Sequence, residues 1–200
     1  MEFTSWFNYI ALNLSAILSF YLYILSVMPK TREKKKGEKA WKECIILRYL
    51  SELFWLILVI CIFLWPLFPI SFLNFVICEN YLFIFTISIL IIIPSSLLVF
   101  LSVKDAGSET IKTLQDTTMY GGIYNQLRHP QITGATPIFI ALCLIVNSLT
   151  LLINLIILMI IIIPIVIYYE EKDLILRFGN SYINYKKETG ALIPKFWTKK

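Results

Sequence analysis

Two short polar segments carry the residue types in this chain that are best suited to chemistry. The first contains a glycine pair, a tyrosine and an Arg-His-Pro triplet, in the order Gly121-Gly122-Ile123-Tyr124-Asn125-Gln126-Leu127-Arg128-His129-Pro130. The second lies two apolar runs later and reads Tyr168-Tyr169-Glu170-Glu171. Arginine can bind a carboxylate or a phosphate through two parallel hydrogen bonds, and glutamates can accept bonds from an amine or from ribose hydroxyls. The two segments therefore predict a polar binding site.

The backbone around the first segment also suits a ligand. The pair Gly121-Gly122 permits a turn and the close approach of a bound molecule. Pro130 fits the first turn of a helix, and the free N–H groups of that turn can receive an anion. A second interpretation treats Arg128 and Lys172 as anchors at a membrane surface and the glutamates as solvated. Local chemistry alone does not favour either interpretation.

The segments that must position these residues are strongly apolar. Of the 200 residues, 58% are hydrophobic, which excludes an ordinary soluble domain. A helix that crosses a bilayer needs about 20 apolar residues, and five runs approach or exceed this length: 6–28, 45–67, 81–103, 130–146 and 151–169. The sequence therefore predicts an all-α, polytopic membrane protein with about five transmembrane helices.

The charged residues predict how these helices are oriented. If five spans alternate in direction, all 18 lysines and arginines fall on one side of the membrane. The excess of basic residues in cytoplasmic loops then places the N-terminus outside and the C-terminus, with both polar segments, in the cytoplasm. The net charge of +5 reflects this topology and attraction to anionic lipids, and no pattern indicates nucleic-acid binding. The four cysteines have no metal-ligand spacing, so no metal site is predicted.

Turn residues predict how the two polar segments meet. Asn147-Ser148 closes a tight antiparallel hairpin between the last two spans, which returns Glu170 to the membrane face of Arg128. Pro66-Leu67-Phe68-Pro69 marks a turn on the outer side. Gly107-Ser108-Glu109 indicates a helix start on the cytoplasmic side.

Two further charged features each allow two interpretations. Residues 30–42 are either a solvated loop that fixes the topology or a clamp for anionic headgroups. Arg48 and Glu52 share one face of a helix and can pair. Because charges inside a membrane helix are costly, this pair is either structural or in contact with a substrate.

The order of the polar pieces resembles a known family. Gly-x-Tyr-x-x-x-Arg-His-Pro is followed by a short helical hairpin, Glu-Glu, Phe178-Gly179-x-x-Tyr182-x-x-Tyr185 and Pro194. This set closely resembles the isoprenylcysteine carboxyl methyltransferases and the wider group of membrane methyltransferases that includes phospholipid N-methyltransferases. The resemblance covers residues 121–194. We expect a single membrane domain, 1–200, in two parts. Residues 1–120 form the N-terminal helices and cytoplasmic loops, and residues 121–200 contain the cofactor-binding motif, the hairpin and a C-terminal cytoplasmic helix.

The resemblance implies an S-adenosylmethionine site at the cytoplasmic face and methyl transfer to a lipid-linked acceptor. The acceptor would be a prenylcysteine carboxylate, an aminophospholipid or another membrane-soluble nucleophile. The residues implied to bind the cofactor are Gly122, Tyr124, Arg128, His129, Pro130, Glu170 and Glu171, with Arg128 and Glu170 in catalytic roles. Tyr182 and Tyr185 would brace the pocket.

The chain departs from the family pattern at two positions. Ile132 stands where the family often has a tyrosine, and Val166 stands where carboxyl methyltransferases have an arginine. These departures weaken the carboxylate acceptor more than the methyltransferase assignment. Two alternatives stay open: a nicotinamide-dependent membrane reductase of the sterol and steroid type, whose C-terminal part carries a similar Arg-His-Pro, and a non-enzymatic relative that binds lipid or a partner.

Overall fold

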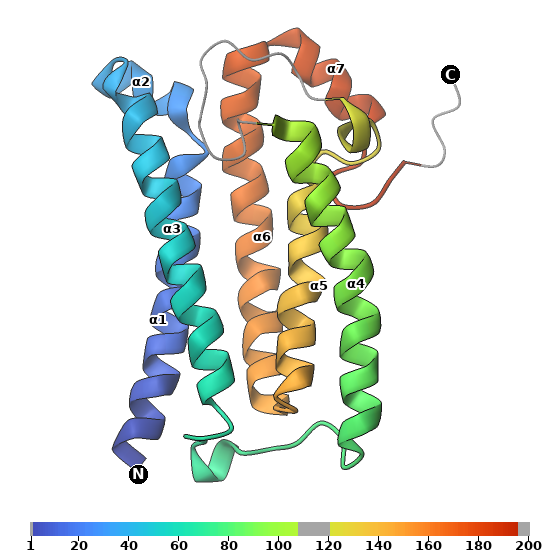
Figure 1. The fold of residues 1–200 in the computed structure, drawn as a ribbon. Helices are drawn as coiled ribbons and strands as arrows, with labels where there is room; N and C mark the ends of the chain where they lie inside the picture. Colours follow the sequence, from blue (N-terminus) through green and yellow to red (C-terminus); the bar gives the residue numbers. More distant parts are fainter. Residues whose placement is uncertain (1, 108–120, 196–200) are drawn as a thin grey trace.

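Five long helices run alternately up and down beside one another in the computed structural model, which describes residues 2–107 and 121–195 (Figure 1). They are α1 (Glu2–Ser26), α3 (Lys39–Leu64), α4 (Tyr81–Ala106), α5 (Pro130–Ile145) and α6 (Leu149–Phe178). Shorter elements join them: α2 (Pro29–Lys36), α7 (Asn180–Glu188) and the 3-10 turns η1 (Ser71–Leu73) and η3 (Gly122–Asn125). The described residues form no β-strand, so the predicted all-α class is confirmed.

Four of these helices, α1, α3, α4 and α6, are long and apolar enough to cross a membrane. The fifth predicted span corresponds to α5, which has 16 residues. At 1.5 Å per residue it is about 24 Å long, against about 30 Å for a bilayer core. Membrane spanning is thus supported for four helices, and the fifth crossing stays a prediction.

Two helices differ from the sequence prediction in their extent. α6 continues beyond residue 169, where the predicted span ends, to Phe178, so both glutamates lie on a rigid helix. The basic segment predicted as a loop contains α2, whose first turn is capped by Asp173 from α6: the backbone N–H groups of Lys30 and Thr31 donate to its carboxylate over 3.2 and 2.6 Å. The helix start predicted at Ser108-Glu109 lies outside the described residues.

Small polar residues let α1 and α3 approach closely. Ser19 and Ser51 are fully buried, and the Ser51 hydroxyl donates to the Ser19 carbonyl over 2.9 Å. Nearer the other end, the Asn8 amide donates to the Cys61 carbonyl over 3.1 Å. Small side chains and interhelical hydrogen bonds are the usual way in which membrane helices pack, because lipid offers no hydrophobic driving force between them.

The α4–α5 pair packs through a glycine. A Cβ atom added to Gly134 would lie 2.8 Å from a methyl carbon of Val99 and 2.9 Å from the Ser95 carbonyl oxygen. Ser88, Ser95 and Ser102 recur every seven residues among the buried residues of α4. A larger residue at position 134 would push the start of α5, which follows the Arg-His-Pro triplet, away from α4.

At the end that holds the N-terminus, Asn147 fastens the α5–α6 hairpin to the loop before α4. Its backbone has a positive φ of 50°. Its side-chain oxygen accepts the N–H groups of Ile77 and Cys78 over 3.0 and 3.1 Å, and its amide donates to the Cys78 carbonyl over 2.8 Å. The Ser148 hydroxyl caps the first turn of α6. The predicted Asn147-Ser148 turn is confirmed, and we call these contacts the Asn147 staple.

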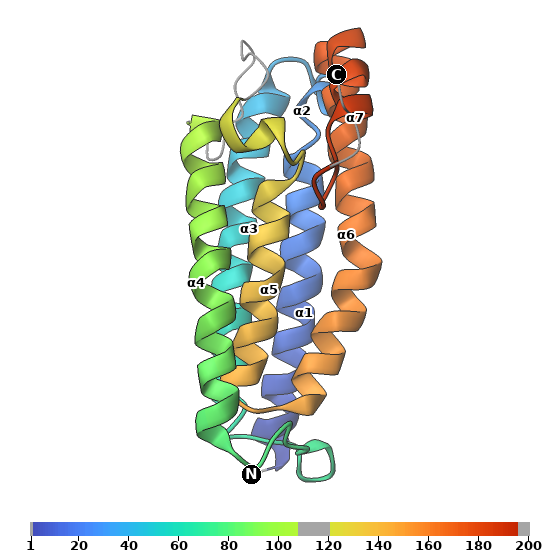
Figure 2. The same cartoon turned by 90° about the vertical axis from the view of Figure 1, so that its right-hand side faces the viewer.

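α6 connects the two helix pairs. Its Asn154 amide donates to the Asn13 side-chain oxygen of α1 over 2.9 Å. At its far end, the Arg177 guanidinium lies over the Trp41 ring of α3 at 5.4 Å. Figure 2 shows the result from the side: α2, η3 and α7 lie at one end of the bundle, opposite the N-terminus. We call this the basic end.

Candidate functional site

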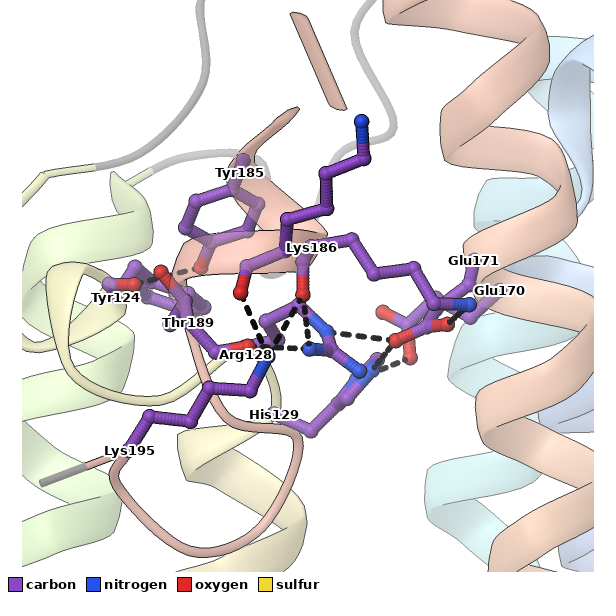
Figure 3. Close-up of polar contacts among 10 residues, drawn as sticks. Tyr124, Arg128, His129, Glu170, Glu171, Tyr185, Lys186, Thr189 and Lys195 are labelled. Carbon is purple, nitrogen blue, oxygen red and sulfur yellow. Dashed lines mark hydrogen bonds and ion pairs between the residues drawn. The ribbon is translucent and has the colours of Figure 1, made fainter. Parts of the chain in front are cut away.

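Glu171 is the centre of a charged network at the basic end. One carboxylate oxygen accepts from the Arg128 Nε at 2.8 Å and lies 3.2 Å from the His129 Nε2. The other oxygen is 2.5 Å from the Lys186 Nζ on α7 (Figure 3). The Glu171 and Arg128 side chains are only 5% and 9% exposed. A buried charge is costly unless it is paired and hydrogen-bonded, so this carboxylate is stable here because cations from two other segments surround it.

His129 lies between both glutamates of α6. Its Nδ1 is 3.1 Å from a Glu170 oxygen, while its Nε2 faces Glu171. Burial alone would lower the pKa of this imidazole, but the adjoining carboxylates of Glu170 and Glu171 outweigh burial and raise the pKa to about 9. The ring is therefore an imidazolium at neutral pH and donates from both nitrogens. With Arg128 and Lys186, three cations meet two carboxylates.

Arg128 also holds the segment that follows α7, which we call the C-terminal strap (residues 189–195). The Arg128 Nη1 donates to the carbonyls of Lys186 and Thr189. The backbone N–H groups of Arg128 and His129 donate to the Gly190 and Ala191 carbonyls over 2.8 and 3.1 Å. These two N–H groups, just ahead of α5, therefore bind the chain itself rather than an anion.

Gly122 and Tyr124 form the support of the Arg-His-Pro triplet. Gly122 has a φ of +63°, and a Cβ there would lie 2.1 Å from an Asp105 carboxylate oxygen. That oxygen accepts the N–H of Ile123 over 2.8 Å, which docks η3 on α4. Tyr124 is buried, and its carbonyl accepts from the Tyr185 hydroxyl over 2.6 Å. Only a glycine fits at position 122 without strain.

Three polar atoms at this site have no hydrogen-bond partner in the part of the chain that the structure describes. The Tyr182 hydroxyl is buried and unpaired, with Glu171, Glu170 and Arg128 as its electrostatic neighbours. The second oxygen of Glu170 and the Nη2 of Arg128 likewise have none. Burial, followed by the two glutamates, raises the pKa of Tyr182 above its ordinary value, so its hydroxyl keeps its proton. These atoms offer one acceptor and two donors to a ligand.

A family model described as phospholipid methyltransferase matches residues 82–181, half of the chain. The chain belongs to the phospholipid methyltransferase family. No curated protein and no solved structure matches the chain. The resemblance predicted from the sequence is confirmed. Membership of this family makes the protein a membrane methyltransferase.

The matched stretch of this methyltransferase runs from α4 into α7 and contains both polar segments. Of the predicted residues, the structure brings Arg128, His129, Glu170 and Glu171 into direct contact, and it places Pro130, fully buried, at the first position of α5. Their roles toward a cofactor stay a prediction. The rings of Tyr182 and Tyr185 lie 5.7 Å apart beside the network, where they can brace it.

Sequence reasoning missed three charged residues of this methyltransferase. Lys186 pairs with Glu171, Asp105 receives η3, and Asp173 caps α2. None belongs to a spaced motif, and each acts on a segment distant in sequence. At the two departures, Val166 is buried and Ile132 is partly buried.

Proposed function

We propose that this protein transfers a methyl group from S-adenosylmethionine to a lipid-linked amine at the cytoplasmic face of a membrane. One observation carries the proposal. The family match spans two segments 43 residues apart, and they meet at the basic end through the 2.8 Å contact between Arg128 and Glu171. Beside that contact, the Tyr182 hydroxyl, the Arg128 Nη2 and one Glu170 oxygen have no hydrogen-bond partner among the described residues.

The chemistry of these atoms fits the cofactor. S-adenosylmethionine has an ammonium, a carboxylate and ribose hydroxyls, and when bound it supplies a methyl group on a sulfonium. Glu170 would accept from the ammonium or a hydroxyl, while the Arg128 Nη2 and the Tyr182 hydroxyl would donate to the carboxylate. Gly122, Tyr124, His129 and Pro130 would act by holding these groups in place.

The membrane orientation follows from the charges. All lysines and arginines among the described residues belong to the basic-end half of the bundle, and none lies near the Asn147 staple. The basic end is then cytoplasmic and the N-terminus is outside. α5 would be the fifth crossing, its shortness accommodated by local thinning of the bilayer or by its flanking residues.

An amine is the acceptor that the residues favour over a carboxylate. Val166, one turn before the glutamates, is buried and apolar, and α6 has no cation between Leu149 and Tyr169 that could address a carboxylate. An amine must lose a proton to attack, and the partly exposed Glu170 carboxylate can take it. The nitrogen gains the methyl group while the electron pair of the breaking carbon–sulfur bond stays on sulfur. Alignment of the two reactants supplies much of the rate.

Ligand-induced stabilisation in detergent tests the cofactor. S-adenosylhomocysteine should raise the melting temperature and NADPH should not, because only a molecule that binds the folded state stabilises it. Labelled S-adenosylmethionine with phosphatidylethanolamine or with a prenylcysteine then tests the acceptor. Stabilisation by NADPH alone would point to a reductase, and stabilisation by neither to a non-enzymatic relative.

Glu170→Gln tests the site itself. We expect the affinity for S-adenosylhomocysteine to fall at least tenfold, because a charged contact is lost from a half-buried position. Arg128→Ala should have an effect at least as large, with some loss of stability. Glu188→Gln, an exposed glutamate on α7, is the matched control and should bind normally. Normal affinity in both site variants would contradict the assignment.

A further inference from the structure

α2 and the first turn of α3 carry an exposed surface of lysines. It consists of Lys34, Lys35, Lys39 and Lys42, and we call it the lysine surface. Their ammonium groups have no hydrogen-bond or ion-pair partner in the part of the chain that the structure describes. α2 and the start of α3 lie on the other side of α6 from α7 (Figure 1). The lysine surface is therefore separate from the charged network around Glu171, and the family match, which begins at residue 82, does not include it.

The neighbouring acids leave this surface positively charged. Glu33 pairs within α2. Glu43 of α3 pairs with Arg32 and Lys36 over 2.8 and 2.6 Å. Residues 30–43 contain seven cations and three acids, which leaves a net charge of +4. The two ion-paired acids therefore do not neutralise the four lysines of the surface.

Contacts near both of its ends fix α2, and with it half of the lysine surface. Asp173 of α6 caps its first turn, and Glu43 binds Arg32 and Lys36 further along the helix. Two of the four lysines are therefore held on a short helix beside the first turn of α3. A backbone that is preorganised in this way loses less conformational entropy when it binds a ligand.

The exposed face of α3 continues from the lysine surface into the membrane span. Exposed residues recur on this face at intervals of three or four, in the order Lys39, Lys42, Ile46, Tyr49, Leu53, Leu56, Ile60 and Phe63. The face changes from basic to apolar over about 10 Å, the rise of the helix from Lys42 to Tyr49. Tyrosine is enriched where the headgroups of a bilayer meet its hydrocarbon core. The order of polarity along this face is therefore that of a phospholipid, from charged headgroup to acyl chain.

We propose that the lysine surface binds the headgroup of an anionic phospholipid whose acyl chains lie along the exposed face of α3. Clusters of basic residues just cytoplasmic of a membrane helix attract anionic lipids, and long lysine side chains can extend toward the headgroups. The apolar continuation of the same face favours a lipid over a free anion or an acidic protein. Of the two interpretations of residues 30–42, the structure thus supports the headgroup clamp. This lipid is not the methyl acceptor, so the inference goes beyond the proposed function and rests only on the membrane span of α3.

Removing the two lysines of α3 tests the site. Phosphatidylglycerol with short acyl chains has an anionic headgroup and no amine, so it cannot act as the acceptor. Titrated into the protein in a neutral detergent, it should bind at least fivefold more weakly to the double variant Lys39→Gln/Lys42→Gln than to the wild type. The double variant Lys104→Gln/Lys187→Gln is the matched control, because it removes the same charge from two other exposed lysines of the basic end. Its affinity should stay within twofold of the wild type.

Variants on either side of this pair should change the affinity in opposite directions. Lys34→Gln/Lys35→Gln should weaken the binding of phosphatidylglycerol at least threefold, because two charges are lost from α2. Glu38→Gln should strengthen it by about twofold, because it removes the exposed acid next to Lys39. All of these side chains are exposed, so the melting temperature without lipid should change little.

Three measurements distinguish a lipid site from a general attraction of charge. Phosphatidylcholine of the same chain length should bind at least tenfold more weakly than phosphatidylglycerol, inorganic phosphate at the same concentration should not compete, and added salt should weaken binding to the wild type. Equal binding of the two lipids, competition by inorganic phosphate, or an equal loss in the control variant would each overturn the inference.

The cofactor separates this inference from the proposed function. S-adenosylhomocysteine should bind every lysine variant within twofold of the wild type, because the lysine surface lies apart from the charged network. A larger loss would place these lysines in the cofactor site and overturn the inference. Selective binding of phosphatidylglycerol by a protein that transfers no methyl group would support the inference and contradict only the proposed function.

Discussion

The two ends of the bundle join distant segments by different means. At one end the Asn147 staple uses one neutral amide, which bonds to backbone groups 69 and 70 residues away. At the basic end, five charged side chains from the start of α5, α6 and α7 meet around Glu171. Both ends fix the α5–α6 hairpin. The fold can therefore close a turn without charge, so the charges at the basic end are available for binding and proton transfer.

Removing Glu171, the centre of the charged network, should reduce the stability of the protein more than any other change at either end. Glu171→Gln leaves three cations close together with one fewer carboxylate. Breaking a buried pair by removing one partner costs about 3–5 kcal/mol, and we expect a loss of stability in this range, measured by thermal unfolding in detergent. A change below about 1 kcal/mol would show that the charged network stabilises the fold no more than the Asn147 staple does.

Proton binding should act on the basic end and leave the other end unaffected. The pKa of His129 is about 9 in the folded protein against an ordinary value of 6.5. The folded state therefore binds this proton more tightly, so the stabilisation is complete below about pH 6.5 and is lost as the pH rises through about 9. The melting temperature should fall over this window by the equivalent of a few kcal/mol.

His129→Gln is the control for this pH dependence. The groups that face His129 are Glu170 and Glu171 of α6, with Arg128 next to it in the chain. Only His129 among them ordinarily titrates between pH 6.5 and 9. The variant should show a flat profile over this range, and an unchanged slope would show that another group is responsible.

A smaller, pH-independent effect is expected at the opposite end. Asn147→Ala removes three hydrogen bonds and puts alanine at a φ of 50°, which should cost about 1–3 kcal/mol. Asn147→Gly loses the same bonds without the unfavourable φ, and should be about 1–2 kcal/mol more stable than the alanine variant. Unfolding measured at pH 6.5 and 9 should give the same difference from wild type. A difference that grows with pH would break the distinction between the ends.

The smallest effect is expected for Lys186→Ala. Its side chain is 45% exposed although its partner Glu171 is buried, and pairs with an exposed member are screened by solvent and salt. We expect a loss below about 1 kcal/mol that shrinks further at high salt. A loss as large as that of Glu171→Gln would show that Lys186 is as essential to the network as the glutamate.

Sequence reasoning recovered the parts of this structure that depend on composition and order. Apolar runs predict the helices, and the turn at Asn147 predicts that Glu170 returns to the face of Arg128. The sequence treats Glu170 and Glu171 as equivalent neighbours, whereas the structure separates them. Glu171 is surrounded by Arg128, His129 and Lys186, whereas one oxygen of Glu170 has no hydrogen-bond partner in the described part of the chain. Successive residues on a helix point about 100° apart, so only the position of the neighbouring segments distinguishes them.

The features that could not be predicted depend on contacts between distant elements. Nothing near Thr189 or Gly190 signals that their carbonyls receive Arg128. In the sequence Asp105 is a single acid before a loop, and only the structure shows that η3 docks on its carboxylate. Asp173 belongs to no motif. The high charge density of residues 30–42 predicts a solvated loop, although this segment contains α2, the helix that the Asp173 carboxylate caps. Each depends on tertiary packing, which local patterns do not encode.

The cap that Asp173 provides for α2 has a consequence for biogenesis. Lys30 leaves the ribosome 143 residues before the aspartate that receives its N–H. At synthesis rates of 5–20 residues per second this delay is on the order of ten seconds. During that time a strongly basic segment waits at the membrane without its partner, free to engage anionic lipid or the insertion machinery. The last long helix, α6, thus completes the first connection of the chain, so a nascent protein truncated before α6 would leave this segment exposed to quality control.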